Sequence, residues 1–141
     1  GWRGLAGDMG SGVVEVAVNA MRERMRTDVA QLQVWLGPCI GPQAFEVGHE
    51  VRDAFCGDQA QASHCFQPGP MKGKWWADLP ALARMRLQAL GVTQITGNDG
   101  SSPWCTVAQQ DLFFSHRRDR VSGRFAASIW RDGQTKYLHW R

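Results

Sequence analysis

The chain has 141 residues, enough for one domain of ordinary size with a buried core. A hydrophobic fraction of 43% and a charged fraction of 21% are typical of a folded protein and exclude a disordered chain. The formal net charge of +3 suits a small anionic substrate and argues against nucleic acid as a partner. No apolar run approaches the roughly 18 residues of a membrane span.

The first predicted element is a helix over residues 13–25, for which Ser11 or Gly12 can serve as the N-cap. Apolar side chains recur in this segment at helical spacing, and Thr27-Asp28 ends the run. The residues that we expect on its apolar face are Val13, Val16, Ala17, Ala20 and Met21.

Two short strands and a rigid loop are predicted next. Residues 32–36 alternate like a half-buried strand, and the loop that follows has two glycines and two prolines around Cys39. Such loops expose backbone groups and often line binding sites. Residues 45–47 favour a second strand and residues 50–55 a short amphipathic helix, whereas the pattern weakens over residues 57–73.

The clearest helix begins at Asp78, a natural N-cap, and ends at Gly91. Pro80 lies in its first turn, where a missing N–H is tolerated. Residues 92–96 predict a strand, so that helix and strand form one unit. The apolar stripe of this helix consists of Leu79, Ala83, Leu87 and Leu90.

The last third of the chain has less regular patterns. Residues 97–103 are rich in turn formers, residues 115–123 are polar and basic, and residues 125–130 predict a final strand. The tail over residues 131–141 has no periodicity. Strands and helices that alternate through short loops predict a mixed α and β fold, and we expect residues 1–141 to form a single domain.

Tryptophan and cysteine are the informative residue types. Of seven tryptophans, Trp75 and Trp76 are adjacent, and adjacent side chains on a strand point to opposite faces. We therefore expect one of them in the core and the other over a cleft or a second subunit. The four cysteines form no Cys-x-x-Cys pair, which favours free thiols in the cytoplasm, with a Cys56–Cys65 disulfide as the alternative.

Four segments in chain order together carry a family resemblance. They are Gly1-Trp2-Arg3-Gly4, then Trp35-Leu36-Gly37-Pro38-Cys39-Ile40-Gly41-Pro42 running into Phe45-Glu46-Val47-Gly48, then Asp78-Leu79 at the start of a helix, and finally Cys105-Thr106 followed by Phe113-Phe114-Ser115-His116-Arg117-Arg118-Asp119 and Gly123-Arg124. Nearly the whole chain thus resembles the laccase-domain family of purine nucleoside phosphorylases, long labelled multicopper polyphenol oxidases. The family includes a bacterial peptidoglycan editing factor.

The resemblance implies an α+β fold in a layered α/β/β/α arrangement with mixed sheets. Family members are longer at the N-terminus, so we expect this chain to be the C-terminal portion of the laccase-like domain and to lack part of the N-terminal half. The family binds zinc through two His and one Cys, and the matched segments place all three ligands upstream of Gly1. No metal ligand is therefore expected among the printed residues. Four scattered histidines also do not suit a multicopper centre.

The activity that the resemblance implies is phosphorolysis of inosine, adenosine and guanosine, with zinc-dependent deamination of adenosine. Phosphorolysis needs phosphate held against the sugar, and the planar fork of an arginine can hold two phosphate oxygens. Arg3 is the favoured catalytic candidate because glycines flank it. Arg117 and Arg118 are candidate substrate-binding residues, with a solvated basic turn as the alternative.

Five further residues are candidates for the site. Cys39 is a candidate catalytic nucleophile or a small residue that fills a tight loop. Asp78 is a candidate acid as well as a helix cap, and the two roles are compatible. His116 stands beside two arginines, which favour a neutral imidazole that can bond to a base or sugar. Cys105 and Thr106 are candidate substrate contacts.

Two other functions stay open. The alternative enzyme is a cytoplasmic amidase that edits peptidoglycan precursors, and the alternative of another class is an inactive fragment or nucleoside-binding module. A nucleoside needs a compact pocket with an aromatic wall, which the tryptophan-rich composition favours. We expect a cytoplasmic protein that could form a homodimer and that acts on purine nucleosides and phosphate.

Overall fold

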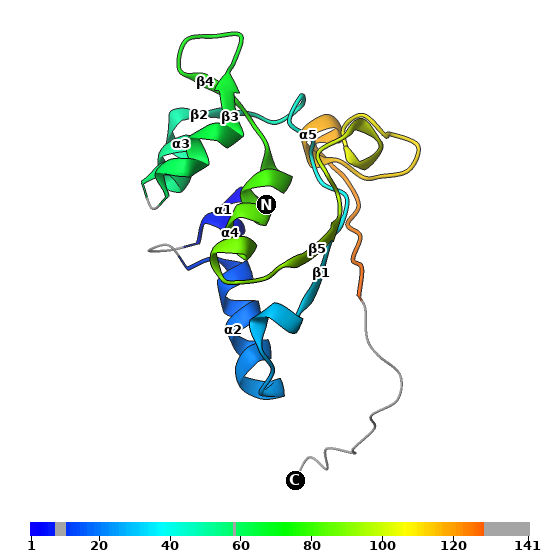
Figure 1. Ribbon diagram of the computed structural model, residues 1–141. Helices are drawn as coiled ribbons and strands as arrows, with labels where there is room; N and C mark the ends of the chain where they lie inside the picture. The colour runs from blue at the N-terminus through cyan, green and yellow to red at the C-terminus, as the bar shows by residue number, and fades with distance from the viewer. Residues whose placement is uncertain (8–10, 58, 129–141) are drawn as a thin grey trace.

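Two small sheets and the helices packed on them form the described part of the chain, residues 1–7, 11–57 and 59–128 of the computed structural model (Figure 1). The parallel sheet pairs β1 (Gln33–Leu36) with β5 (Gln94–Gly97), and the antiparallel sheet places β4 (Lys74–Ala77) between β2 (Glu46–Gly48) and β3 (Phe66–Pro68). The helices are α1 (Trp2–Ala6), α2 (Val13–Met25), α3 (His49–Cys56), α4 (Leu79–Ala89) and α5 (His116–Asp119). The predicted α+β class, with parallel and antiparallel sheets, is confirmed.

Helix α4 connects the two hydrophobic cores. Leu82 lies in the larger core with Phe55 of α3, where both side chains are at most 1% exposed. Leu87, one turn further along α4, lies in the smaller core with Val18 of α2 and Val92. Figure 1 accordingly shows α4 at the centre, between the antiparallel sheet and the β1–β5 pair. Burying apolar surface on two sides fixes this helix firmly.

The ends of α4 are those that the sequence predicts. The Asp78 carboxylate accepts a hydrogen bond from the backbone N–H of Ala81 at 2.9 Å, which is the geometry of an N-cap. Beyond the other end, Gly91 has a φ of +91°, a conformation that glycine adopts without strain. The cap fixes the place of Asp78 at the junction of β4 and α4.

Helix α2 has the predicted bounds but buries a different face. Val14 and Val18 pack inward, and between them the Glu15 carboxylate lies 3.0 Å from the Arg86 guanidinium of α4. Because this ion pair holds Glu15 inside, the predicted apolar face turns outward. All side chains of this face are exposed except Ala20, which is half-buried. The face consists of Val13, Val16, Ala17, Ala20 and Met21.

Two regions of the chain differ from the prediction. Residues 57–73 contain β3 and a 3-10 helix over Ala60–Cys65, which no clear pattern indicated. The strand predicted over residues 125–130 is not formed over residues 125–128, and residues 129–130 lie outside the described residues. A strand forms when a neighbour satisfies its backbone N–H and C=O groups, and no described strand pairs with this segment.

All four cysteines lie in the described residues and have free thiols, as predicted, so the alternative Cys56–Cys65 disulfide is not formed. Among the helices that the structure describes, none combines the length and the apolar character that crossing a membrane requires.

Candidate functional site

Two loops leave the same edge of the parallel sheet and lie side by side. β1 and β5 run in parallel, so their carboxyl ends meet at one edge, the place where open α/β sheets commonly bind ligands. Beyond that edge the backbone N–H of Cys39 donates to the Trp104 carbonyl at 3.2 Å, and the Thr106 N–H donates to the Cys39 carbonyl at 2.9 Å. Cys39, Cys105 and Thr106, distant in sequence, are thereby brought together.

The side chain of Asn98, which is 2% exposed, holds these loops together. Its amide nitrogen donates to the Gly37 carbonyl at 3.1 Å and to the Cys39 sulfur at 3.4 Å. Its amide oxygen accepts from the Gly100 N–H at 2.9 Å. Arg84 of α4 supports the same turn, since one guanidinium nitrogen donates to the Asn98 carbonyl at 2.6 Å. Asn98 is not among the site residues predicted from the sequence, although an asparagine directly after a strand is a turn signal.

The thiol of Cys39 is kept protonated. Burial is the main cause that raises the pKa of Cys39 from 9.0 to about 11, the hydrogen bond from Asn98 opposes this shift, and the charge of Asp78 adds to it. At neutral pH the sulfur is therefore a thiol and not the thiolate that a nucleophile requires. This environment fits the packing role considered for Cys39 better than the nucleophilic one.

Cys105 and Thr106 are both buried, at 6% and 7% exposure. The Cys105 sulfur accepts the backbone N–H of Gly41 at 3.2 Å, which closes the Cys39 loop onto the second loop. Cys105 nevertheless forms part of the wall of a hollow, together with residues 41–44 and 100–102. This smaller hollow has a volume of about 310 Å³.

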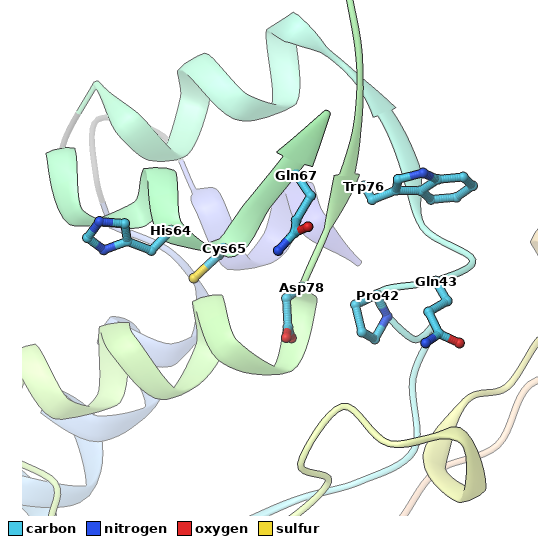
Figure 2. A pocket seen from close by; sticks show the side chains of 7 residues that line it. All are labelled: Pro42, Gln43, His64, Cys65, Gln67, Trp76 and Asp78. Atoms are coloured by element: carbon cyan, nitrogen blue, oxygen red, sulfur yellow. The ribbon is translucent and has the colours of Figure 1, made fainter. Parts of the chain in front are cut away.

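A larger hollow of about 590 Å³ lies on the other side of the same loop. Pro42 and Gln43 border both hollows, so the two are neighbours. Figure 2 shows the side chains around the larger one: Pro42, Gln43, His64, Cys65, Gln67, Trp76 and Asp78. Its wall thus combines an aromatic ring, two amides, a carboxylate and an imidazole. Burial first, and then the charge of Asp78, raises the pKa of the Cys65 thiol in this wall.

The two adjacent tryptophans divide as predicted. Trp75 packs against the larger core, and the Arg52 guanidinium lies 4.5 Å from the centroid of its ring. Trp76 belongs to the wall of the larger hollow. Strand β4 therefore presents one indole to the core and the next one to a cavity.

Arg118 is fully engaged within the protein. Its guanidinium donates to the backbone carbonyls of Thr106, Val107 and Phe113 at 2.8 to 3.2 Å, and to both carboxylate oxygens of Asp119. Five N–H groups thereby meet five acceptors, which is the full donor capacity of an arginine. The hydrogen bond from Arg118 lowers the pKa of Asp119. No donor of Arg118 is left for a phosphate in this arrangement.

None of the other basic candidates lines either of the two hollows. Arg117 is exposed, donates to the Glu46 carbonyl at 2.9 Å and lies over the ring of Phe45. His116 is exposed beside a separate shallow hollow in the last loop. The guanidinium of Arg3 makes no hydrogen bond or ion pair within the described part of the chain, and it lies 5.5 Å from the centroid of the Trp2 ring. Arg3 and Arg117 therefore keep donors for an anion.

The described residues do not fit a zinc centre. In residues 1–7, 11–57 and 59–128, no three His, Cys, Asp or Glu side chains gather closely enough to hold a metal ion. A zinc site needs three or four such ligands. The expectation that zinc ligands lie elsewhere stays a prediction.

Known proteins resemble this chain along nearly its whole length. A purine nucleoside phosphorylase of Pseudomonas aeruginosa is 45% identical over 130 residues, which are 92% of this chain and 49% of that protein. An adenosine deaminase from an unknown prokaryotic organism is 35% identical over 132 residues, 93% of this chain and 48% of that protein. The crystal structure of the Neisseria meningitidis protein NMB0706, 41% identical, superposes with a TM-score of 0.69 over 84% of this chain and 44% of that one.

The chain spans about half the length of the curated relatives that it matches. The model of a family described as multi-copper polyphenol oxidoreductase laccase matches residues 1–132. This match covers the parallel sheet, both hollows and every candidate residue considered above. The chain belongs to this family.

Proposed function

We propose that the protein is a purine nucleoside phosphorylase, acting on inosine, adenosine and guanosine. The observation that carries the proposal is a compact hollow with aromatic and amide walls, at the loops of a chain 45% identical to a protein of that name. A volume of about 590 Å³ lies within the range of small-molecule sites. Because the chain spans about half of its relatives' length, the proposal concerns the protein to which these residues belong.

The reaction sets clear requirements for the residues. A phosphate oxygen forms a bond to the sugar C1′ while the bond from C1′ to the purine N9 breaks, and the electron pair of that bond goes to the purine. A proton from solvent or an acid then completes the free base, and ribose 1-phosphate is the other product. Arg3 is the proposed phosphate ligand, because its guanidinium is exposed and makes no hydrogen bond within the described residues.

Deamination of adenosine is the proposed second activity, and it has the weaker support of one more distant relative's name. Zinc would supply an activated water for that reaction. We place its ligands outside the described residues, since no cluster within them suits a metal ion. We place the protein in the cytoplasm, a compartment that keeps four unpaired cysteines reduced.

The test is release of hypoxanthine from inosine by the purified protein with and without phosphate, followed by liquid chromatography. We expect release that depends on phosphate and that Arg3→Ala abolishes. Arg24→Ala, at an exposed arginine of α2, is the matched control and should leave the rate unchanged. An unchanged rate in Arg3→Ala would remove Arg3 from the site, and an absence of phosphate-dependent release would contradict the function itself.

A further inference from the structure

We propose that the larger hollow is the purine subsite, in which the base stacks on Trp76 while Gln43, Gln67 and Asp78 bind its polar edge. This inference rests on the proposed function, because it assigns a place to that function's substrate. The seven lining residues come from three parts of the chain: the loop after β1, the 3-10 helix with β3, and the junction of β4 with α4 (Figure 2).

Trp76 is free to stack on a ligand. Its neighbour Trp75 is held by the core and by Arg52. Because adjacent side chains on a strand point to opposite faces, Trp76 is directed to the cavity. Among the described residues Trp76 pairs with no other aromatic ring and with no guanidinium. A rigid indole with an open face is the usual platform for a flat base, whose π-surface it covers.

The strand register places an amide beside this ring. Gln67 of β3 lies directly opposite Trp76 of β4, and directly opposed residues of an antiparallel pair share a face of the sheet. Figure 2 shows both side chains at the hollow, with the Gln67 amide directed toward the Asp78 side. Gln43 approaches from the loop after β1. Neither glutamine amide makes a hydrogen bond within the described residues, so both keep two donors and an acceptor for a ligand.

Among the described residues that line the hollow, Asp78 is the one that carries an acidic group. One carboxylate oxygen is used by the helix cap, where it accepts from the Ala81 N–H at 2.9 Å. The second oxygen can accept an N–H of the base, such as N1–H of a 6-oxopurine or the 6-amino group of adenine. An amide can donate to or accept from either edge, so this combination suits 6-oxo and 6-amino purines alike.

The position of the smaller hollow leaves room for the rest of a nucleoside. It borders the same two residues, Pro42 and Gln43, and its wall includes Ser101 and Ser102, whose hydroxyls suit a sugar. A base at Trp76 would thus have its glycosidic bond near the Pro42–Gln43 border. The larger hollow alone has ample volume for a purine, so the base does not have to displace any side chain.

The test is calorimetric titration of the purified protein with hypoxanthine and with adenine, without phosphate, so that no turnover is needed. Trp76→Ala should weaken the binding of both bases by about tenfold to a hundredfold, as loss of base–aromatic stacking does. Gln67→Leu, at an exposed position that the fold does not need, should weaken it about tenfold. Trp35→Ala is the matched control, because Trp35 is also a partly exposed strand tryptophan, at 47% exposure, but does not line the hollow.

Unchanged binding of both bases in Trp76→Ala and Gln67→Leu, with both variants folded by circular dichroism, would overturn the subsite. Failure of the unmodified protein to bind either base would overturn it as well. The result also separates the two proposals. If base binding depends on Trp76 but no phosphorolysis occurs, the subsite proposal stands and the phosphorylase proposal is rejected. If phosphorolysis occurs and Trp76→Ala leaves the KM for inosine unchanged, the phosphorylase proposal stands and the subsite proposal is rejected.

Discussion

The guanidinium of Arg118 is the anchor of the last described loop, because it binds three backbone carbonyls and the Asp119 carboxylate. Replacing Arg118 with Ala leaves these acceptors without their donor, so we expect the melting temperature to fall by several degrees. The melting temperature of Arg118→Lys should fall nearly as far, since an ammonium cannot reach five separate acceptors. The measurement is a thermal unfolding curve for each variant.

Arg117→Ala serves as the control for this prediction. Arg117 is the preceding arginine, is exposed and makes a single side-chain hydrogen bond within the described residues, so its loss should barely change the melting temperature. If Arg118→Ala instead kept its melting temperature and raised the KM for phosphate, Arg118 would be a substrate ligand and not an anchor.

The protonated thiol of Cys39 leads to a second prediction at this scale. A catalytic nucleophile is needed for most of the rate, so its removal costs a thousandfold or more. Because the pKa of Cys39 is raised to about 11, we expect Cys39→Ser to keep activity within a few-fold of the unmodified protein. The folded protein holds this proton more tightly than the unfolded chain does. The associated stabilisation should therefore be present below pH 9 and be lost as the pH rises toward 11.

Steady-state rates of the Cys39→Ser variant and urea unfolding between pH 8 and pH 11 measure the two effects. A loss of a thousandfold or more in the rate of a folded variant would restore Cys39 as a nucleophile.

Single residues were predictable from the sequence where their role is local. Asp78 caps the helix that it precedes, and its partner Ala81 lies three residues away. The roles of Asn98 and Arg118 could not be predicted, because their partners are backbone carbonyls and a sulfur that only the folded loops bring near. Asn98 reaches Cys39 across 59 residues of sequence. A motif indicates which residue types recur, but not whether an arginine faces a ligand or a carbonyl.

Helices α2 and α4 are joined by the buried ion pair of Glu15 with Arg86, whose side chains are 15% and 3% exposed. Removing one partner of a buried pair leaves the other charge poorly compensated, at a cost of about 3–5 kcal/mol. We therefore expect Arg86→Ala to lower the free energy of unfolding by about that amount. The double variant Glu15→Leu, Arg86→Met should be close to the unmodified protein, because apolar packing can replace such a pair.

Urea unfolding of the single and double variants measures this, with Arg22→Ala on the exposed side of α2 as the control, expected within about 0.5 kcal/mol. A stable Arg86→Ala variant would mean that the pair does not hold α2 to α4.

Elements were predictable in proportion to their length. The 13 residues of α2 and the 11 of α4 contain several helical turns, so periodicity and capping locate them. The three residues of β3 are too few for an alternation to be recognised. The buried face of α2 escaped prediction for a different reason. The predicted apolar face does not include Glu15, whereas its pairing with Arg86 brings it inside, which no periodicity in α2 alone can reveal.

At the scale of the whole molecule, the parallel pairing of β1 with β5 determines where a site can form. It places the loops after both strands at one edge, and the cap of α4 adds Asp78 beside them. The family could be identified from four ordered motifs, while the hollow itself could not, because Gln43, Gln67 and Trp76 come from segments that only the fold unites. The shape of the hollow depends on contacts between segments that are far apart in the sequence, and local sequence patterns do not encode these contacts.

The central claim is that these loops belong to an enzyme that transfers the sugar of a purine nucleoside to phosphate. The most direct measurement is phosphorus NMR of the protein with inosine and inorganic phosphate, alongside chromatography of the base. We predict ribose 1-phosphate and hypoxanthine in equal amounts, and neither when phosphate is left out. Hypoxanthine formed with free ribose at a rate independent of phosphate, or no product at all, would contradict the claim.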